Sequence, residues 1–532
     1  MLINYDRDNY LSEFSHKTLQ DRYLIEGETS PQDAFARAAK AFSDDDAHAQ
    51  RLYDYASKLW FMFSTPILSN GGTSRGLPIS CFLNYVEDSR QGLTGHYTEN
   101  AFLSSVGGGV GGSWSAVRSV GSTTSNGSES TGVIPFMKVV DAEMLAFSQG
   151  VTRRGSYAAY LDISHPEVEE FLDVRKPTGG DVNRKSVNLH HGVLIDDKFM
   201  DIIEQATRVE GFDDSWDLID PHSKKIIKTV SAKTLWVKLI QNRVETGEPY
   251  IMFKDTVQAA LPQFQKDLGL QVNHSNLCSE ITLATNANRT AVCCLSSVNL
   301  EEYDEWKDNP QFINDLVRML DNVITHFCDA APAQLYRAVA SAKAERSIGL
   351  GAMGFHAYLQ RHNIPFESAM AKSRNNKMFS FIKGEAENAT RELAVERGPC
   401  PDGASAGVRN AHLLAVAPNA SSSIICGNTS PSIEPYRANA FTQKTKSGSS
   451  LLKNEYLEHA LQEIGQDTDD VWKSIITNGG SVQHLEFLDD YTKDVFKTAV
   501  EIDQRWVIEM AADRQEKICQ SQSLNIFFPS NV

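Results

Sequence analysis

The chain has 532 residues, of which 41% are hydrophobic and 22% are charged, an ordinary composition for a globular protein with a large core. Its formal net charge of −17 argues against a general nucleic-acid or membrane-surface binder, but not against a local basic pocket for a phosphorylated small molecule. Its eight cysteines form no CxxC, and no HExxH occurs, so neither a disulfide scaffold nor a usual zinc site is indicated. The polar opening residues and the lack of an apolar run of roughly 18 residues predict a cytoplasmic protein.

Residues 1–63 predict a mostly helical region, and residues 64–532 predict one large domain. Ser30-Pro31 is typical of a helix start, because proline fits the first helical position. Residues 232–248 and 311–330 have the apolar spacing of amphipathic helices. No internal repeat or low-complexity linker divides the second region, which favours a single α/β domain with a helical lead-in.

A loop rich in Gly, Ser and Pro is predicted for residues 64–89, leading into a short strand that carries Cys81. Its hydroxyls, among them those of Thr65 and Ser80, are candidate phosphate contacts. Gly107–Gly112 formally contains GxGxxG, but no long helix follows and no clear acidic residue lies about 20 positions on. An NAD-type dehydrogenase is therefore the weaker interpretation, and close passage of the backbone past a ligand or another strand is the better one.

Two further segments carry candidate ligand contacts. Residues 148–156 hold Arg153 and Arg154 beside glycines, where a solvated surface is the usual outcome but phosphate or base contacts also fit. Residues 412–435 run from an apolar strand through Pro418-Asn419-Ala420-Ser421-Ser422 toward a possible helix. Hydroxyls and unpaired N–H groups at a helix start suit an anion, but an ordinary helix cap explains the same residues equally well.

The most informative segment is Asn276-Leu277-Cys278-Ser279-Glu280. If it is extended, its amide, thiol and carboxyl side chains point the same way, because strand side chains repeat every second residue. One pocket then receives a hydrogen-bonding amide, a reactive sulfur and an acid/base. Taken alone, however, a buried and inert cysteine is the commoner outcome for such a residue.

Four segments in combination resemble the large (catalytic) subunit of class I ribonucleotide reductase. They are NLCSEI (276–281), CCLSSVNL (293–300), the STP…SC stretch (64–81) and PNASSS…IEP (418–435). The resemblance runs along nearly all of the chain and outweighs the inert interpretation of Cys278. It implies a ten-stranded α/β barrel of two parallel five-stranded halves, with the radical cysteine on a central finger loop.

The resemblance also implies a chemistry, in which the ribose is made a radical before its 2′-hydroxyl is removed. Cys278 matches the cysteine whose thiyl radical abstracts the 3′ hydrogen. Glu280 matches the carboxylate that takes the 3′-hydroxyl proton, and Asn276 matches the amide that hydrogen-bonds the sugar hydroxyls. Cys81 and Cys293 match the pair that supplies two electrons and ends as a disulfide.

Two adjacent cysteines compete for the second redox position. In the family the redox cysteine lies two positions before a Leu-Ser pair, which is Leu295-Ser296 in this sequence. That match selects Cys293 over Cys294. Alternation along a strand agrees, because neighbouring side chains face opposite sides.

The remaining matches are to ligand contacts. The residues that match substrate diphosphate and sugar contacts are Thr65, Ser80, Gly109, Pro418, Asn419, Ala420, Ser421 and Ser422. Those that match the contacts of an allosteric dNTP or ATP at a dimer interface are Asp88, Ser89 and Arg118. The loop with Arg153 and Arg154 matches the segment that relays effector identity to the substrate base, which is a coupling free energy between two sites.

The sequence departs from the class I pattern at both ends. It contains no adjacent tyrosines and no CxxC-like tail, and only 64 residues precede Thr65, too few for the family's ATP cone. These departures predict a truncated or split subunit, whose remainder is a separate polypeptide or is lost. The cobalamin-dependent class, which needs no tyrosine pair, and a catalytically silent nucleotide-binding fragment remain as alternatives.

The resemblance implies several partners and no cofactor or metal bound by this chain itself. A metal-containing small subunit is expected to supply the radical, and a second copy of the chain to complete a homodimer. Thioredoxin or glutaredoxin is expected as the reductant, with dNTP or ATP as effectors. Neither nucleic acid nor a membrane is an expected partner.

Overall fold

A computed structural model describes residues 1–147, 155–445 and 448–529, so Arg153 and Arg154 lie outside the described residues. A mixed sheet with the strand order β1-β9-β2-β3-β4-β5-β8 forms its centre, and β10 also pairs with β9. The strands of this sheet are β1 (Phe61–Phe63), β2 (Cys81–Tyr85), β3 (Gly109–Ser113), β4 (Ser156–Asp162), β5 (His190–Ile195), β8 (Tyr250–Phe253), β9 (Ala291–Asn299) and β10 (Ile348–Met353).

Two parallel sets of strands meet where β2 pairs antiparallel with β9. The first set is β2, β3, β4, β5 and β8, all parallel to their neighbours. In the second set β10 runs parallel to β9, and isolated parallel bridges at Leu350–Leu414 and Val416–Gln522 extend it. The predicted α/β barrel with two parallel halves is confirmed, and within the described residues the second half is continued by bridges instead of long strands.

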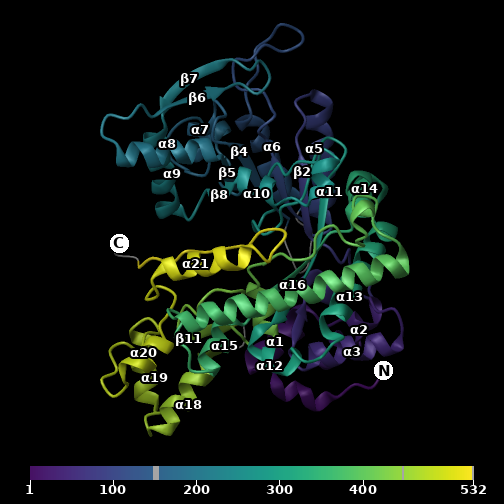
Figure 1. The fold of residues 1–532 in the computed structure, drawn as a ribbon, viewed down its shortest axis with the longest axis vertical. Helices are drawn as coiled ribbons and strands as arrows, with labels where there is room; N and C mark the ends of the chain where they lie inside the picture. The colour runs from purple at the N-terminus through teal and green to yellow at the C-terminus, as the bar shows by residue number, and fades with distance from the viewer. Residues whose placement is uncertain (148–154, 446–447, 530–532) are drawn as a thin grey trace.

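Helices surround this sheet, and α13 and α16 cross the middle of the view in Figure 1. The predicted helices at 232–248 and 311–330 are present as α9 (Ala232–Thr246) and α13 (Phe312–Ala330). The other helices beyond the N-terminal region are α5 (Arg90–Ser105), α6 (Ile134–Ala146), α7 (Val168–Leu172), α8 (Asp197–Arg208), α10 (Lys254–Ala260), α11 (Gln263–Asp267), α12 (Tyr303–Trp306), α14 (Tyr336–Glu345), α15 (Phe355–Arg361), α16 (Ala369–Arg397), α17 (Ala420–Ile425), α18 (Glu455–Glu463), α19 (Asp469–Thr477), α20 (Asp490–Val495) and α21 (Gln504–Gln515).

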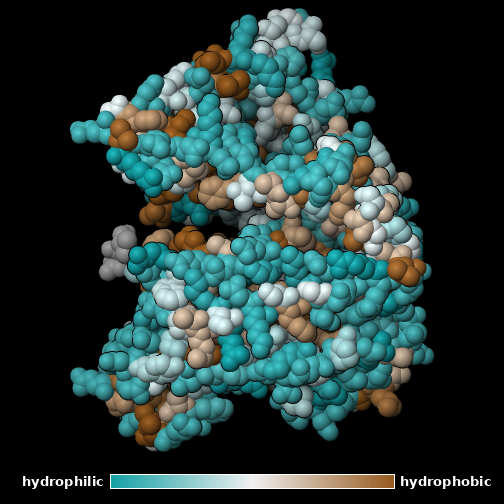
Figure 2. All heavy atoms as spheres, in the orientation of Figure 1, coloured by the Kyte–Doolittle hydropathy of each residue, from teal (hydrophilic) through white to brown (hydrophobic). Residues whose placement is uncertain are grey.

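Two small hairpins lie outside the main sheet, β6 (Ser215–Ile219) with β7 (Ile226–Ser231) and β11 (Ala440–Thr445) with β12 (Gly448–Lys453). Figure 2 shows a deep notch in the visible face, between the part that carries α8 and α9 and the part that carries α21. Within the described part of the chain, no helix combines the length and the apolar character that a membrane crossing requires.

The N-terminal residues contain α1 (Glu13–Arg22), α2 (Pro31–Ala41) and α3 (Asp46–Ser57). Ser30 and Asp33 form a reciprocal capping box that starts α2. The predicted loop at 64–89 is wrong at its beginning, because Thr65–Asn70 forms helix α4. Pro66 lies in the first turn of α4, where its missing N–H breaks no helical hydrogen bond, so it helps to begin a helix.

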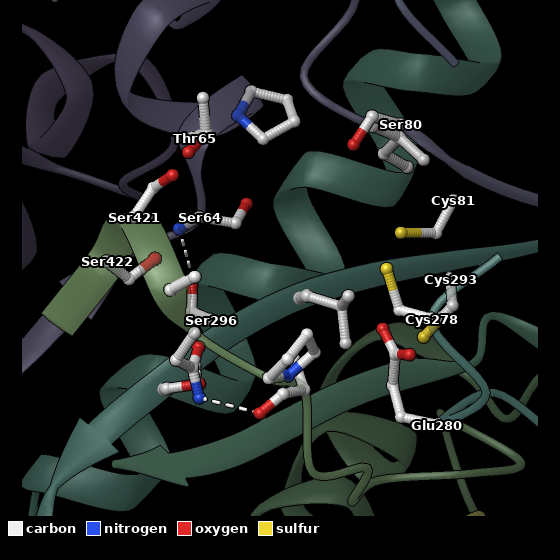
Figure 3. A pocket seen from close by; sticks show the side chains of 18 of the residues that line it. Ser64, Thr65, Ser80, Cys81, Cys278, Glu280, Cys293, Ser296, Ser421 and Ser422 are labelled. Carbon is white, nitrogen blue, oxygen red and sulfur yellow. Dashed lines mark hydrogen bonds between the residues drawn. The ribbon is translucent and has the colours of Figure 1, made fainter. Parts of the chain in front are cut away.

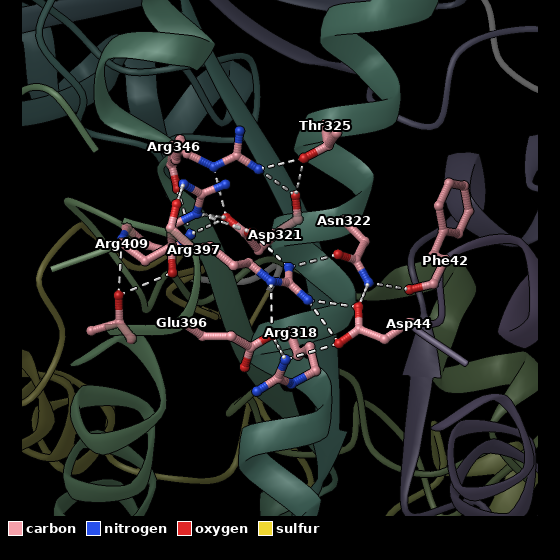
Figure 4. Close-up of polar contacts among 12 residues, drawn as sticks. Phe42, Asp44, Arg318, Asp321, Asn322, Thr325, Arg346, Glu396, Arg397 and Arg409 are labelled. Atoms are coloured by element: carbon pink, nitrogen blue, oxygen red, sulfur yellow. Dashed lines mark hydrogen bonds and ion pairs between the residues drawn. The ribbon is translucent and has the colours of Figure 1, made fainter. Parts of the chain in front are cut away.

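A buried ion cluster joins the N-terminal helices to the helices outside the barrel (Figure 4). The Asp321 carboxylate on α13 contacts Arg346, Arg397 and Arg409, and Arg397 also contacts Asp44 just before α3. Burial alone would raise the pKa of Asp321, but the three guanidinium groups outweigh burial and hold this pKa below its usual range. Removing one partner would leave an uncompensated buried charge, so the cluster fixes how these elements sit together.

Candidate active site

A cavity of about 280 Å³ lies where β2, β9, the start of α4 and the start of α17 meet. Figure 3 shows the sulfurs and Glu280 gathered on one side, with Ser80 above Cys81, and the side chains of Ser64, Thr65, Ser421 and Ser422 on the other. The predicted site residues that line it are Thr65, Ser80, Cys81, Cys278, Glu280, Cys293, Pro418, Asn419, Ala420, Ser421 and Ser422. Asn276 and Gly109 are not among the lining residues.

Two of the cysteines face each other across paired strands. Cys81 on β2 lies directly opposite Cys293 on β9, and both side chains are buried. Opposite residues of an antiparallel pair have Cβ atoms about 4.5–5.5 Å apart, only slightly more than a disulfide requires. Burial, with the neighbouring Cys81 charge adding to it, raises the pKa of the Cys293 thiol well above its usual range. The pair is therefore placed to close into a disulfide after small movements.

The neighbouring Cys294 points elsewhere. It pairs in register with Ile348 of β10, packs in the main hydrophobic core and does not line the cavity. Alternation along β9 places adjacent side chains on opposite faces, which explains the difference. Of the two adjacent cysteines, only Cys293 has its sulfur on the cavity side.

The segment that carries Cys278 is a turn, so the condition on which the alternation argument depended, an extended chain, is not met. Leu277 and Cys278 lie in the turn, and Ser279 adopts a left-handed φ of 66°. The Ile281 N–H donates to Asn276 Oδ1 at 3.1 Å, which closes the turn from within. Alternation therefore does not aim these side chains, although Cys278 and Glu280 still reach the cavity from the two sides of the turn.

Asn276 is buried beneath this turn, with 1% of its surface exposed. The Tyr160 hydroxyl donates to its backbone carbonyl at 2.7 Å, which anchors the turn to β4. Its side-chain Nδ2 has no hydrogen-bond partner within the described part of the chain. A buried donor without a partner is costly and calls for a functional explanation. The amide N–H is thus available for a group that enters from the cavity after a small shift of the turn.

The glycine run at 107–112 lets this turn approach the sheet. A Cβ atom on Gly111 would lie 2.0 Å from the Ser275 carbonyl oxygen and 2.8 Å from Asn276 Cα. Most of the run lies in strand β3, and no helix follows directly after this strand, so the dinucleotide interpretation is wrong. The alternative use, close passage of two backbones, is confirmed. Gly109 lies opposite Cys81 in the sheet.

The hydroxyl side of the cavity is formed by two helix starts. Asn419, with a left-handed φ of 55°, precedes α17. Its Oδ1 accepts from Ser297 Oγ on β9 at 3.0 Å, and its Nδ2 donates to the Ala352 carbonyl of β10 at 3.1 Å. Across the cavity, Thr65 at the start of α4 lies 3.0 Å, oxygen to oxygen, from the Tyr23 hydroxyl. Both helix starts therefore present hydroxyls from positions fixed by the surrounding structure.

Comparisons with known proteins identify the family of this chain. Family models match residues 79–403 and 401–532 as "Ribonucleotide reductase, barrel domain" and residues 10–76 as "Ribonucleotide reductase, all-alpha domain". The chain belongs to the ribonucleotide reductase large-subunit family. A protein of Frog virus 3 is 52% identical over 484 residues, which cover 90% of this chain and 83% of that protein.

Two further relatives agree with this assignment. The ribonucleoside-diphosphate reductase large subunit of Invertebrate iridescent virus 3 is 45% identical over 577 residues, covering 99% of this chain and 90% of that protein. The structure of a class Id ribonucleotide reductase alpha subunit from Actinobacillus ureae matches with a TM-score of 0.85 at 36% identity, covering 99% of this chain and 92% of that one. The resemblance to a class I large subunit is confirmed.

The predicted effector residues of this ribonucleotide reductase chain lie together, away from the cavity lining. Arg118 Nε is 3.0 Å from Asp88 Oδ2, and the backbone N–H of Arg118 also donates to Asp88 Oδ1 at 3.2 Å. Ser89 caps α5 by accepting from the Gly92 N–H at 2.9 Å. His222, beside the β6–β7 hairpin, adds a contact to Asp88 at 3.3 Å. The role of Asp88, Ser89 and Arg118 in binding an effector stays a prediction.

Some residues of the ribonucleotide reductase cavity were missed in the sequence. Ser64, Ser296 and Ser297 also line it. All three stand inside the STP and CCLSSVNL motifs, so the motif letters beside the cysteines were the available signal. Gln520 was missed as well; it does not line the cavity, but its side chain contacts Cys293 from the C-terminal segment.

Proposed function

We propose that this cavity reduces the ribose of a ribonucleoside diphosphate to the 2′-deoxyribose, making a precursor for DNA synthesis. The observation that supports this most is that three thiols and one carboxyl share one cavity, with Cys81 and Cys293 opposite each other on paired strands. A diphosphate and sugar would then be held by the hydroxyl side and by the Pro418–Ser422 turn. Family membership supports the same reaction.

Each side chain receives a role in this proposal. Cys278, as a thiyl radical, takes the 3′ hydrogen of the sugar, and Glu280 takes the 3′-hydroxyl proton. The Asn276 amide hydrogen-bonds the sugar hydroxyls. Cys81 and Cys293 supply two electrons and two protons, so the 2′-hydroxyl leaves as water and the two sulfurs become a disulfide. When bound, a metal-containing small subunit supplies the radical that Cys278 needs.

The pairing of the redox cysteines gives a direct prediction. Cys293→Ser should prevent disulfide formation with Cys81 and stop multiple turnovers, because only Cys293 faces Cys81 on the cavity side. Cys294→Ser, a matched change one residue away, should leave disulfide formation intact because its sulfur packs in the core. Peptide mapping of alkylated protein after one turnover measures both. Loss of the disulfide in Cys294→Ser alone would reverse the assignment.

The class of enzyme is tested by the source of the radical. We expect deoxyribonucleotide product only when a class I small subunit is present, since the structural match is to a class I alpha subunit. The assay is run with and without a polypeptide that carries an adjacent tyrosine pair, because the sequence contains none. Product from adenosylcobalamin with no second subunit would place the chain in the cobalamin-dependent class. Substrate binding without product in any arm would favour a silent nucleotide-binding subunit.

We further propose that a homodimer forms and that thioredoxin or glutaredoxin restores the thiols. In this dimer Asp88, Ser89 and Arg118 would bind a dNTP or ATP effector. Arg118→Ala should weaken dNTP binding by about tenfold, because a guanidinium–phosphate hydrogen bond is charge-assisted. Calorimetric titration with a dNTP measures this. Arg208→Ala, which removes an exposed arginine of α8 paired with Glu204, is the control, and equal affinities in both variants would refute the site.

A further inference from the structure

Gln520 reaches the redox pair from the C-terminal segment of the described chain. This segment lies against the turn at residues 276–280, because the Ser521 N–H donates to the Glu280 carbonyl at 2.9 Å. The Gln520 N–H donates to the Leu414 carbonyl at 3.2 Å. The Gln520 side chain is 97% buried, since only 3% of its surface is exposed. Its backbone and its burial therefore fix where the side-chain amide can point.

The orientation of this amide follows from its partners. Gln520 Nε2 lies 3.0 Å from the Ile348 carbonyl oxygen and 3.9 Å from Cys293 Sγ. A carbonyl only accepts, so the amide nitrogen and not its oxygen must face Ile348. The same nitrogen then directs its second hydrogen toward the Cys293 sulfur. The amide Oε1 has no hydrogen-bond partner within the described residues. A buried acceptor without a partner costs folding free energy, which a glutamine with only a structural role would have no reason to lose.

The Cys293 sulfur is confined on another side by Gly349. A Cβ atom on Gly349 would lie 3.0 Å from Cys293 Sγ and 3.1 Å from the Ala415 Cβ. The sulfur thus sits between a bare glycine Cα of β10 and the Gln520 amide. Among the residues that the structure describes, no side-chain donor contacts the Cys294 sulfur, which lies in the apolar core.

We propose that Gln520 is a positioning residue for the redox pair, whose amide N–H holds the Cys293 sulfur and stabilises it as the leaving thiolate when the disulfide is re-reduced. This inference rests on the proposed function, because it assumes the Cys81–Cys293 disulfide. Cys81 becomes the sulfur that the reductant attacks, and its side chain is the more exposed of the two, at 6% against 2% for Cys293. A thiol with a more stable thiolate leaves faster in thiol–disulfide exchange.

The step balances with an external dithiol as reductant. One thiolate of the dithiol attacks Cys81 Sγ, a mixed disulfide forms there, and the Cys81–Cys293 bond breaks with its electron pair on Cys293. The second thiol of the reductant then attacks the mixed disulfide and releases Cys81. The reductant ends as a disulfide, and the two protons that it gave up protonate Cys293 and Cys81.

The groups around Cys293 set the pKa of its thiol and therefore how readily its thiolate leaves. Burial raises the pKa of Cys293, Cys81 and Cys294 add to this as neighbouring thiols, Gln520 opposes it through its hydrogen bond, and Glu280 raises it further. Removing the amide donor therefore raises the pKa of Cys293 further and makes its thiolate a poorer leaving group. Loss of one hydrogen bond to a charged group should slow the exchange by about tenfold or more.

The test measures re-reduction of the Cys81–Cys293 disulfide separately from ribonucleotide turnover. Full-length protein is oxidised with diamide, and the rate of reduction by dithiothreitol is measured between pH 6 and 9. In Gln520→Met we expect a slower rate at every pH in this range, because the Cys293 thiolate becomes a poorer leaving group while the attacking thiol is unchanged. Gln522→Met is the matched control, because Gln522 donates to the Ala511 carbonyl of α21 and contacts neither cysteine. An unchanged rate in Gln520→Met would overturn the proposal.

Two further measurements keep the inference separate from folding and from the proposed function. Glutathione, a monothiol, should be trapped on Cys81 in peptide maps of the oxidised protein, and trapping on Cys293 would overturn the proposal. If Gln520→Met fails to fold, Gln520→Glu serves, and its rate relative to wild type should fall as pH rises and the carboxyl ionises. Failure of wild-type protein to form the disulfide with diamide would overturn this inference. Lack of deoxyribonucleotide product beside a Gln520-dependent re-reduction would overturn the proposed function alone.

Discussion

Replacing Cys278 by serine should lower turnover by at least about a thousandfold, because a serine hydroxyl cannot carry the hydrogen-abstracting radical that the proposed reaction needs. Binding of a ribonucleoside diphosphate should change by no more than about twofold, since the hydroxyl side of the cavity is untouched. Cys278 lies in a turn at the sulfur side of the cavity, and serine is nearly isosteric with it. The measurements are deoxyribonucleotide formation with a small subunit and equilibrium binding of the substrate.

A matched control comes from a cysteine outside the site. Cys328 on α13 is a free thiol that packs against the main hydrophobic core and does not line the cavity. Cys328→Ser should retain turnover, which would show that the loss in Cys278→Ser is specific to that sulfur. Substantial product from Cys278→Ser would remove Cys278 from the proposed radical chemistry. Equal losses in both variants would instead indicate general damage to the protein.

The sequence predicted the barrel, the cysteines and much of the cavity, because these depend on local motifs. The STP…SC and CCLSSVNL motifs placed Cys81 and Cys293 on strands, and both strands are present as β2 and β9. Their direct opposition follows from the antiparallel pairing of those strands, which no local pattern determines. The family resemblance that these motifs carry thus identified members of the cavity, and strand register supplied their arrangement.

What failed was the geometry of the segment around Cys278. The argument from alternating side chains required an extended chain, whereas Ser279 adopts a left-handed φ of 66°. A serine in a sequence does not predict this conformation, because few non-glycine residues adopt it. Gln520 was missed for a related reason, since it contacts Cys293 across 227 positions of sequence. Contacts between segments this far apart depend on how the barrel closes. A local sequence pattern therefore does not predict them.

Gly111 lies where β3 passes against the segment that leads into the Cys278 turn, so it links the fold to the proposed chemistry. Gly111→Ala should push the loop off the strand, because the added Cβ would lie 2.0 Å from the Ser275 carbonyl oxygen, and both partners are backbone that cannot rotate away. We expect a loss of about 1–3 kcal/mol in the free energy of unfolding from overpacking. Turnover should fall by about a hundredfold, because Cys278 and Glu280 would be displaced from the sugar.

The two effects can be separated by a second glycine. Gly384 lies inside α16, and a Cβ there meets no atom within 4 Å, so Gly384→Ala should raise stability by up to about 1 kcal/mol and leave turnover unchanged. Urea unfolding and product formation are measured on both variants. If Gly111→Ala kept wild-type turnover and stability, the loop could not rest on β3 as described. If it lost turnover but kept stability, the close contact would serve the placement of Cys278 and not the integrity of the barrel.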